Sequence, residues 1–167
     1  APNAEEYLVV FQEGNFLDGE IFGYRLPGSA PGVLPSEPFP IADSFLWERS
    51  PSVAHVGGTY PTYDGRTHDK TLIVSYVLEN KFDNTYDLKV QKVYEGQNST
   101  YGKPQSFAKY PFGESKVSYS FVVGRWTKGP ILTLWEREWD TSNYSENTDI
   151  YAASVWPFQS FVPLIIH

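Results

Sequence analysis

Cysteine is absent from this chain of 167 residues. The absence excludes a disulfide framework, a thiolate metal site and a cysteine nucleophile. Long apolar runs are also missing: the longest, residues 161–166, contains a proline, whereas a membrane-spanning helix needs about 20 apolar residues. We therefore expect a soluble protein with no membrane span. A chain of this length can bury a hydrophobic core that is stable without disulfide bonds.

Basic residues are in the minority. Lys and Arg together number 13 against 20 Asp and Glu, which gives a formal net charge of −7. Nucleic acid and anionic membrane surfaces repel such a charge. The balance therefore argues against nucleic acid and anionic membrane surfaces as partners and favours neutral or cationic ligands.

Aromatic residues are abundant, whereas alanine is scarce. The chain has 12 Tyr, 11 Phe and 5 Trp, and it is punctuated throughout by 13 Gly and 13 Pro. This composition favours strands and turns, and the sequence has no convincing amphipathic helix. We predict one all-β domain over residues 1–167.

Alternation of apolar and polar residues predicts the strands. In residues 116–123, Val117, Tyr119, Phe121 and Val123 fall on one face, which is typical of an antiparallel strand. Similar patterns give about eleven short antiparallel strands in all. They are residues 7–12, 20–26, 44–49, 53–60, 72–78, 86–90, 105–110, 116–123, 131–139, 149–156 and 161–166.

A tetrapeptide, LWER, occurs at residues 46–49 and again at residues 134–137. Together with matches at an offset of 45 residues in the second half of the chain, it predicts three degenerate internal repeats, 17–63, 70–113 and 115–158. The strands 7–12 and 161–166 lie outside the repeats, and their pairing would close the sheet and remove two exposed edges. A closed barrel, a β-prism and a β-trefoil-like fold each satisfy this pattern.

The two tetrapeptides also suggest a binding surface. On a strand, Trp47 and Arg49 share one face while Glu48 lies on the other, and Trp135, Arg137 and Trp139 likewise share a face. One interpretation is a ladder of guanidinium groups stacked on indole rings. The other is a ligand platform, in which an exposed indole contacts the apolar face of a sugar and the arginine donates hydrogen bonds to its hydroxyls.

Amide and acid side chains in predicted loops complete the candidate site: Asp64, Asn98 and Asn143. Asn98 and Asn143 each begin a glycosylation sequon, and the first residues show no charged-then-apolar leader. Any signal peptide is thus already gone or never existed. On the sequons we expect an extracellular or secreted protein, with a cytoplasmic one left open.

These features predict a lectin-like carbohydrate-binding protein with repeated shallow sites that gain from multivalent engagement. The expected partners are neutral glycans or glycoproteins, and a homo-oligomer is left open. No catalytic residue, metal or cofactor is predicted, because the pair Glu136 and Glu138 and the stretch around His68 are each explained by solvated surface.

Two alternatives remain open. A β-barrel carrier or enzyme would bind a small apolar ligand in its interior, with Phe121, Trp135 and Trp139 pointing inward. An inhibitor or toxin-like interaction protein would present the proline-rich stretch 27–38 to a partner.

Overall fold

The computed structural model describes residues 6–14, 19–27, 37–61, 67–94, 98–111, 115–123, 131–139, 148–155 and 162–164. Every regular element in these ranges is a β-strand, and every strand pair is antiparallel. The predicted all-β class is confirmed.

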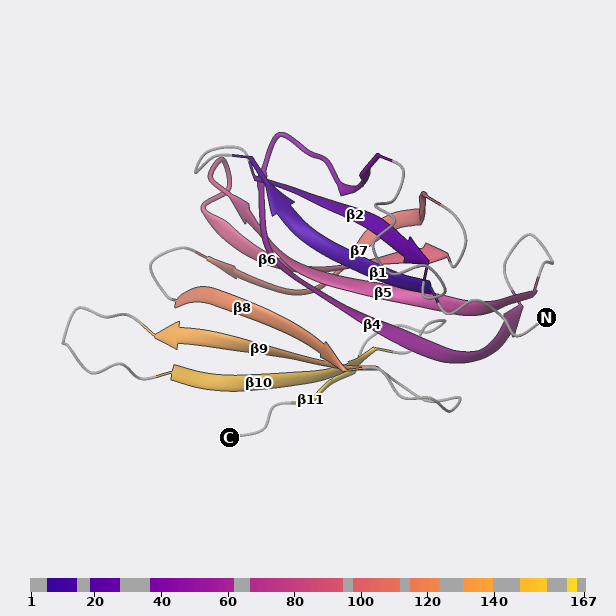
Figure 1. The fold of residues 1–167 in the computed structure, drawn as a ribbon. Coiled ribbons are helices and arrows are strands. Elements are labelled where there is room, and N and C mark those ends of the chain that lie inside the picture. Colours follow the sequence, from indigo (N-terminus) through magenta and orange to yellow (C-terminus); the bar gives the residue numbers. More distant parts are fainter. Residues whose placement is uncertain are drawn as a thin grey trace.

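The strands form three sheets (Figure 1). The first sheet has the order β1-β2-β3, with β1 (Glu6–Glu13), β2 (Glu20–Pro27) and β3 (Phe39–Ala42). The middle sheet has the order β4-β5-β6-β7, with β4 (Trp47–Pro61), β5 (Thr67–Asn80), β6 (Thr85–Tyr94) and β7 (Thr100–Pro111). The third sheet has the order β11-β10-β9-β8, with β8 (Ser115–Val123), β9 (Ile131–Trp139), β10 (Thr148–Val155) and β11 (Val162–Leu164).

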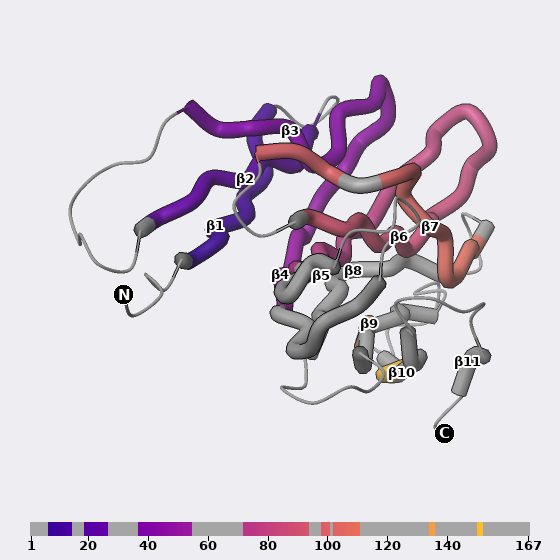
Figure 2. The backbone as a smooth tube through the Cα atoms, turned by 90° about the vertical axis from the view of Figure 1, so that its right-hand side faces the viewer, coloured from indigo at the N-terminus to yellow at the C-terminus, as the bar shows by residue number. Residues whose placement is uncertain are grey.

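The middle sheet lies between the other two (Figures 1 and 2), and its central strands β5 and β6 are largely buried on both faces. Successive residues of a strand point to opposite faces. On β5, Val74 and Tyr76 therefore pack against the first sheet, while Val77 packs with Leu88 of β6 against Trp135 of the third sheet. Burial on both faces also encloses polar side chains of the middle sheet: Glu48, Ser75, Glu79, Thr85, Asp87 and Gln91.

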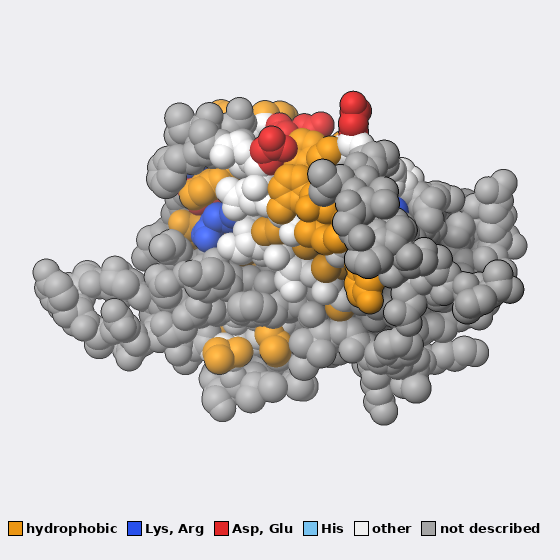
Figure 3. Space-filling view, viewed as in Figure 1, with side chains coloured by type: hydrophobic (Ala, Val, Ile, Leu, Met, Phe, Trp, Pro, Cys, Tyr) orange, Lys and Arg blue, Asp and Glu red, His pale blue; other side chains and the backbone are white. Residues whose placement is uncertain are grey.

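The outer face of the first sheet carries aromatic rings. Phe11 of β1 lies opposite Phe22 of β2, with 6.1 Å between ring centroids, and 5.5 Å from the ring of Tyr24. Leu8 and Val10 point to the opposite face of β1 from Phe11 and pack into the core. Figure 3 shows apolar side chains gathered where this sheet faces the viewer, with acidic side chains above them.

Most predicted strands are confirmed, with two differences. Residues 44–49 and 53–60 were predicted as separate strands, but β4 runs continuously from Trp47 through a β-bulge between Arg49 and Ser52, where Ser50 has a φ of 53°. A bulge inserts an extra residue without ending the strand. The extra residue shifts the alternation of apolar and polar residues, which looks like the end of a strand in the sequence. The short strand β3 was missed because Pro40 stands inside it, which is allowed since β3 is an edge strand.

The terminal strands do not pair with each other. β1 pairs with β2 and β11 pairs with β10, in sheets on opposite sides of the middle sheet. Strands close in sequence pair at a smaller cost in loop-closure entropy than strands at opposite ends of the chain. The described residues form no closed barrel, so the barrel, prism and trefoil alternatives are not confirmed.

The predicted repeats map onto the sheets unequally. Residues 70–113 cover the three-stranded meander β5-β6-β7 except for the first three residues of β5, and residues 115–158 contain the meander β8-β9-β10. Residues 17–63 are divided, because β2 and β3 belong to the first sheet and β4 to the middle sheet. The common origin of the three units stays a prediction.

Candidate functional site

Trp47 and Arg49 adopt the stacked arrangement. The guanidinium carbon of Arg49 lies 5.4 Å from the centroid of the Trp47 ring and 5.7 Å from that of Tyr86. Arg49 Nε also lies 3.8 Å from Glu79 Oε2, and Lys81 Nζ lies 5.4 Å from the Trp47 ring centroid. The arginine thus contacts rings of its own protein, as in the ladder interpretation, and the use of this face as a ligand platform stays a prediction.

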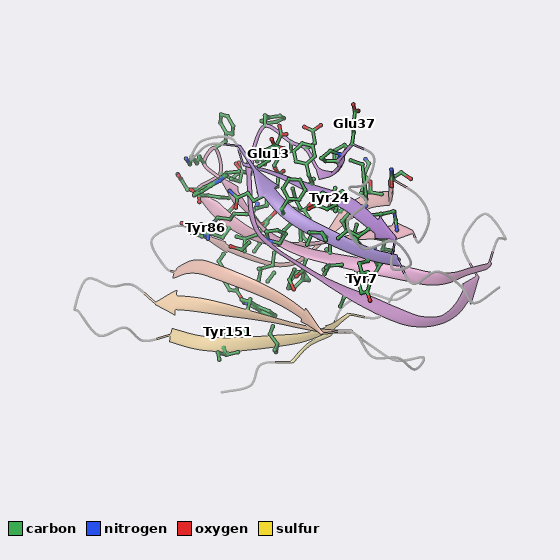
Figure 4. All side chains as sticks on the ribbon, viewed as in Figure 1. Tyr7, Glu13, Tyr24, Glu37, Tyr86 and Tyr151 are labelled. Atoms are coloured by element: carbon green, nitrogen blue, oxygen red, sulfur yellow. The ribbon has the colours of Figure 1, made fainter. Side chains whose placement is uncertain are left out.

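Trp135 lies in the contact between the middle and third sheets. Its side chain is buried, and its Nε1 donates a hydrogen bond of 3.1 Å to the Tyr110 hydroxyl. Its ring stacks on Tyr151 at 5.7 Å between centroids and meets the edge of Phe107 at 5.5 Å. Tyr86 and Tyr151 mark the two sheets in Figure 4. Contrary to the expectation of an exposed ring, the Trp135 indole is a core group.

The other predicted residues are spread over the chain. Arg137 and Trp139 lie on β9, where Arg137 pairs with Val117 and Trp139 with Ser115. Asn98 is exposed in the bend before β7, and Asp64 and Asn143 lie outside the described residues. Of the predicted residues whose side chains the structure describes, namely Trp47, Arg49, Asn98 and Trp135, it brings Trp47 and Arg49 together.

A pocket of about 540 Å³ lies on the opposite side of β4, between β3 and the middle sheet. We call it the Glu48 pocket. Ile41, Leu46 and Leu78 give it apolar walls, and its polar lining includes Glu48, Tyr76, Lys89 and Gln91. Its volume is in the range of small-molecule sites.

Glu48 is the buried acid of this wall, and one of its two carboxyl oxygens lacks a hydrogen-bond partner among the described residues. Its backbone N donates to the Gly19 carbonyl oxygen at 2.8 Å, which fixes the start of β4 beside the first sheet. Its side chain is 1% exposed; Oε1 accepts a hydrogen bond from Ser44 Oγ, and no described group bonds Oε2. A buried polar atom without a partner is unfavourable for folding and is uncommon in native proteins, so it calls for an explanation.

Burial also changes the acidity of the pocket. Removal from water raises the pKa of Glu48 to about 7; hydrogen bonds from Ser44 and from the Glu48 backbone N–H oppose the rise, while the carboxylates of Glu20 and Asp43 add to it. Burial, aided by the charge of Glu48, raises the pKa of the Tyr76 hydroxyl above its usual range. At neutral pH the pocket therefore presents a carboxyl near its titration midpoint and a hydroxyl that keeps its proton.

The other polar groups of the pocket are held in place by β7. Gln91 Nε2 donates to the Gly102 carbonyl oxygen at 3.2 Å. Lys89 Nζ donates to Ser106 Oγ and lies 3.1 Å from Asp87 Oδ2. The lysine charge is thus partly balanced inside the protein, and the pocket is organised before any ligand enters it.

The arrangement suits a small polar ligand that carries no strong charge. A carboxyl, a hydroxyl and an amide come from the adjacent strands β4, β5 and β6, over apolar walls. Among the described residues, no group of three or more His, Asp or Glu side chains is placed to hold a metal ion.

Sequence reasoning missed this site. Glu48 was placed correctly on the face opposite Trp47, beside Leu46, but it was not singled out. An acid alternating with apolar residues at the start of a predicted strand was the only available signal. Tyr76 and Gln91 belong to other strands, and their proximity to Glu48 depends on the strand order.

No protein-family model matches the chain, and neither the curated proteins nor the solved structures include a match to it. In the part of the chain that the structure describes, no helix is long and apolar enough to cross a membrane.

Proposed function

We propose that the protein binds a carbohydrate in the Glu48 pocket. The observation that carries this proposal is the buried Glu48 Oε2, which lacks a hydrogen-bond partner in the wall of a ligand-sized pocket. Because this oxygen is itself buried, a ligand hydroxyl would reach it once the Glu48 carboxyl turns toward the cavity, and the bond would then remove a penalty of about 1–3 kcal/mol, which is the usual cost of leaving such a group unsatisfied.

The chemistry of the walls supports a sugar over an ion. Sugar hydroxyls both donate and accept hydrogen bonds, so they suit a half-protonated Glu48, the Tyr76 hydroxyl and the Gln91 amide. The apolar C–H face of the ring suits Ile41 and Leu78. The net charge of −7 disfavours anionic ligands. This proposal keeps the lectin-like function and moves it from a surface platform to a pocket between sheets.

A second candidate is a small apolar ligand, bound by a carrier. The apolar walls of the same pocket favour it. The two candidates differ at Glu48, because an apolar ligand leaves the carboxyl unsatisfied and gains nothing from it.

Binding can be tested with the full chain. A glycan array would be followed by calorimetric titration with the methyl glycosides of glucose, galactose, mannose and N-acetylglucosamine, and with dodecanoic acid as the apolar probe. We expect a glycoside to bind and Glu48→Leu to weaken that binding by about tenfold or more, equivalent to about 1.4 kcal/mol. Arg49→Lys, on the opposite face of β4, is the matched control and should bind as the wild type does.

The outcomes separate the candidates. Binding of dodecanoic acid alone, unchanged or strengthened by Glu48→Leu, would favour the carrier. Absence of any glycan signal for the wild type, or equal sugar affinities for the wild type and Glu48→Leu, would rule out the proposed site.

An extracellular location belongs to the same proposal. Asn98, the first residue of one sequon, is exposed, as glycan attachment requires. Expression through a eukaryotic secretory pathway should therefore give a product whose mass falls on glycosidase treatment. The Asn98→Gln variant, expressed in the same way, should have a lower mass than the wild type.

A further inference from the structure

Two exposed phenylalanine rings touch each other beside the Glu48 pocket. Phe45 is 83% exposed and Phe82 is 79% exposed, more than any other large apolar side chain in the described part of the chain. Their ring centroids are 6.3 Å apart with an interplanar angle of 70°. Phe45 precedes β4 and Phe82 lies in the turn between β5 and β6, so the Phe45–Phe82 pair joins two separate segments.

Both segments are fixed by side-chain hydrogen bonds to the backbone. Ser44 Oγ accepts from the Leu46 N–H at 3.1 Å, across Phe45. Asn80 Oδ1 accepts from the N–H of Phe82 at 3.0 Å and from that of Asp83 at 3.2 Å. The backbone that carries each ring is therefore held in place before a ligand arrives, which lowers the entropy lost on binding.

The position of Phe45 links the pair to the pocket. Its neighbours Ser44 and Leu46 both line the pocket, and Ser44 also bonds Glu48. Phe45 lies between them in the bend before β4 and is exposed without lining the cavity itself, so its ring stands outside the cavity, one residue from its lining. A ligand that extends from the pocket over this margin meets an apolar surface.

We propose that the Phe45–Phe82 pair is a second subsite, which contacts the apolar face of the sugar ring next to the ring held in the pocket. The ligand is then an oligosaccharide or a glycan chain rather than a free monosaccharide. This inference rests on the proposed function. Two adjoining rings exposed to water add little to folding, whereas covering them with a sugar removes apolar surface from water.

The test compares affinity with ligand length. Wild-type protein is titrated with glucose, maltose and maltotriose, and with N-acetylglucosamine, chitobiose and chitotriose. In the series that binds, we expect the second ring to tighten binding by roughly tenfold, as burial of a ring-sized apolar surface allows. In the double variant Phe45→Ala, Phe82→Ala, the ratio of disaccharide to monosaccharide affinity should fall to about one.

The matched control is Tyr7→Ala, an exposed aromatic on β1, which should keep the wild-type ratio. Thermal denaturation shows whether each variant is folded. If neither monosaccharide nor longer sugar binds, the proposed function itself fails. If a monosaccharide binds but length adds nothing, or if the double variant keeps the increment, the subsite is wrong while the pocket stands. If octyl glucoside gains affinity and maltose does not, the pair receives an aliphatic chain and the sugar-ring assignment is overturned.

Discussion

Trp135 donates a hydrogen bond from its indole Nε1 to the hydroxyl of Tyr110, at 3.1 Å, across the contact between the third and middle sheets. The other copy of the tetrapeptide places Trp47 at the start of an edge strand, against Arg49 and Lys81. The difference arises because Trp135 projects from β9 against the middle sheet, whereas Trp47 stands at the end of the edge strand β4. The same tetrapeptide thus contributes a core residue in β9 and a half-buried cluster of charged and aromatic side chains in β4.

Tyr110→Phe should lower the free energy of unfolding by about 1–3 kcal/mol, because it removes the acceptor of a buried indole N–H. Chemical denaturation measures the change. Tyr7→Phe removes an exposed hydroxyl and should change stability by less than about 0.5 kcal/mol. Equal effects of the two substitutions would contradict a stabilising role for the Trp135–Tyr110 bond.

Glu48→Gln should stabilise the protein in a pH-dependent way. The pKa of Glu48 is raised from 4.5 to about 7, so between these values the folded protein holds a proton that the unfolded chain has released. Wild-type stability therefore falls as pH rises through this window, by on the order of 3 kcal/mol from this group. Gln does not titrate, so the variant should exceed the wild type above about pH 7 and match it below about pH 4.5.

Denaturation midpoints of both proteins across this pH range test the linkage. Glu79→Gln is the control, because Glu79 is paired with Arg49 and loss of its charge should not stabilise the protein at neutral pH. A Glu48→Gln effect that is the same at every pH would show that Glu48 titrates normally.

Gly19→Ala should be destabilising by about 1–3 kcal/mol through overpacking. A Cβ at Gly19 would lie 2.5 Å from Trp47 Cδ1 and 2.7 Å from the Glu48 carbonyl oxygen, and the backbone atom cannot swing away. Gly102→Ala meets nothing within 4 Å but has a φ of +67°, so it should cost only about 1 kcal/mol of backbone strain. Thermal denaturation ranks the two variants, and a larger loss for Gly102→Ala would be inconsistent with close packing at Gly19.

Arg49→Lys should destabilise the fold while leaving sugar affinity within about twofold of the wild type. Arg49 stacks on Trp47 and Tyr86, and lysine lacks the planar group that does so. The expected loss is about 0.5–1 kcal/mol by denaturation. Because Arg49 lies on the face of β4 opposite the Glu48 pocket, a tenfold loss of sugar affinity measured by calorimetry would restore the surface platform as the site.

The sequence by itself determined the strands, because side-chain alternation is a local property with a period of two residues. Residues 131–139 show this, since the predicted strand and β9 coincide. Where a proline interrupts the pattern, as Pro40 does in β3, local reasoning failed. Side-chain alternation also placed Glu48 and Trp47 on opposite faces of one strand, but it does not show which face is covered.

The tertiary structure alone decided the order of the strands and the stacking of the sheets. Only this order brings Glu48, Tyr76 and Gln91 into one wall, and only this stacking buries Trp135 while leaving Phe45 and Phe82 exposed. Burial depends on contacts between residues far apart in the chain, so no local pattern can reveal whether a carboxyl will be removed from water. The candidate site therefore depends on packing between strands that are far apart in the sequence.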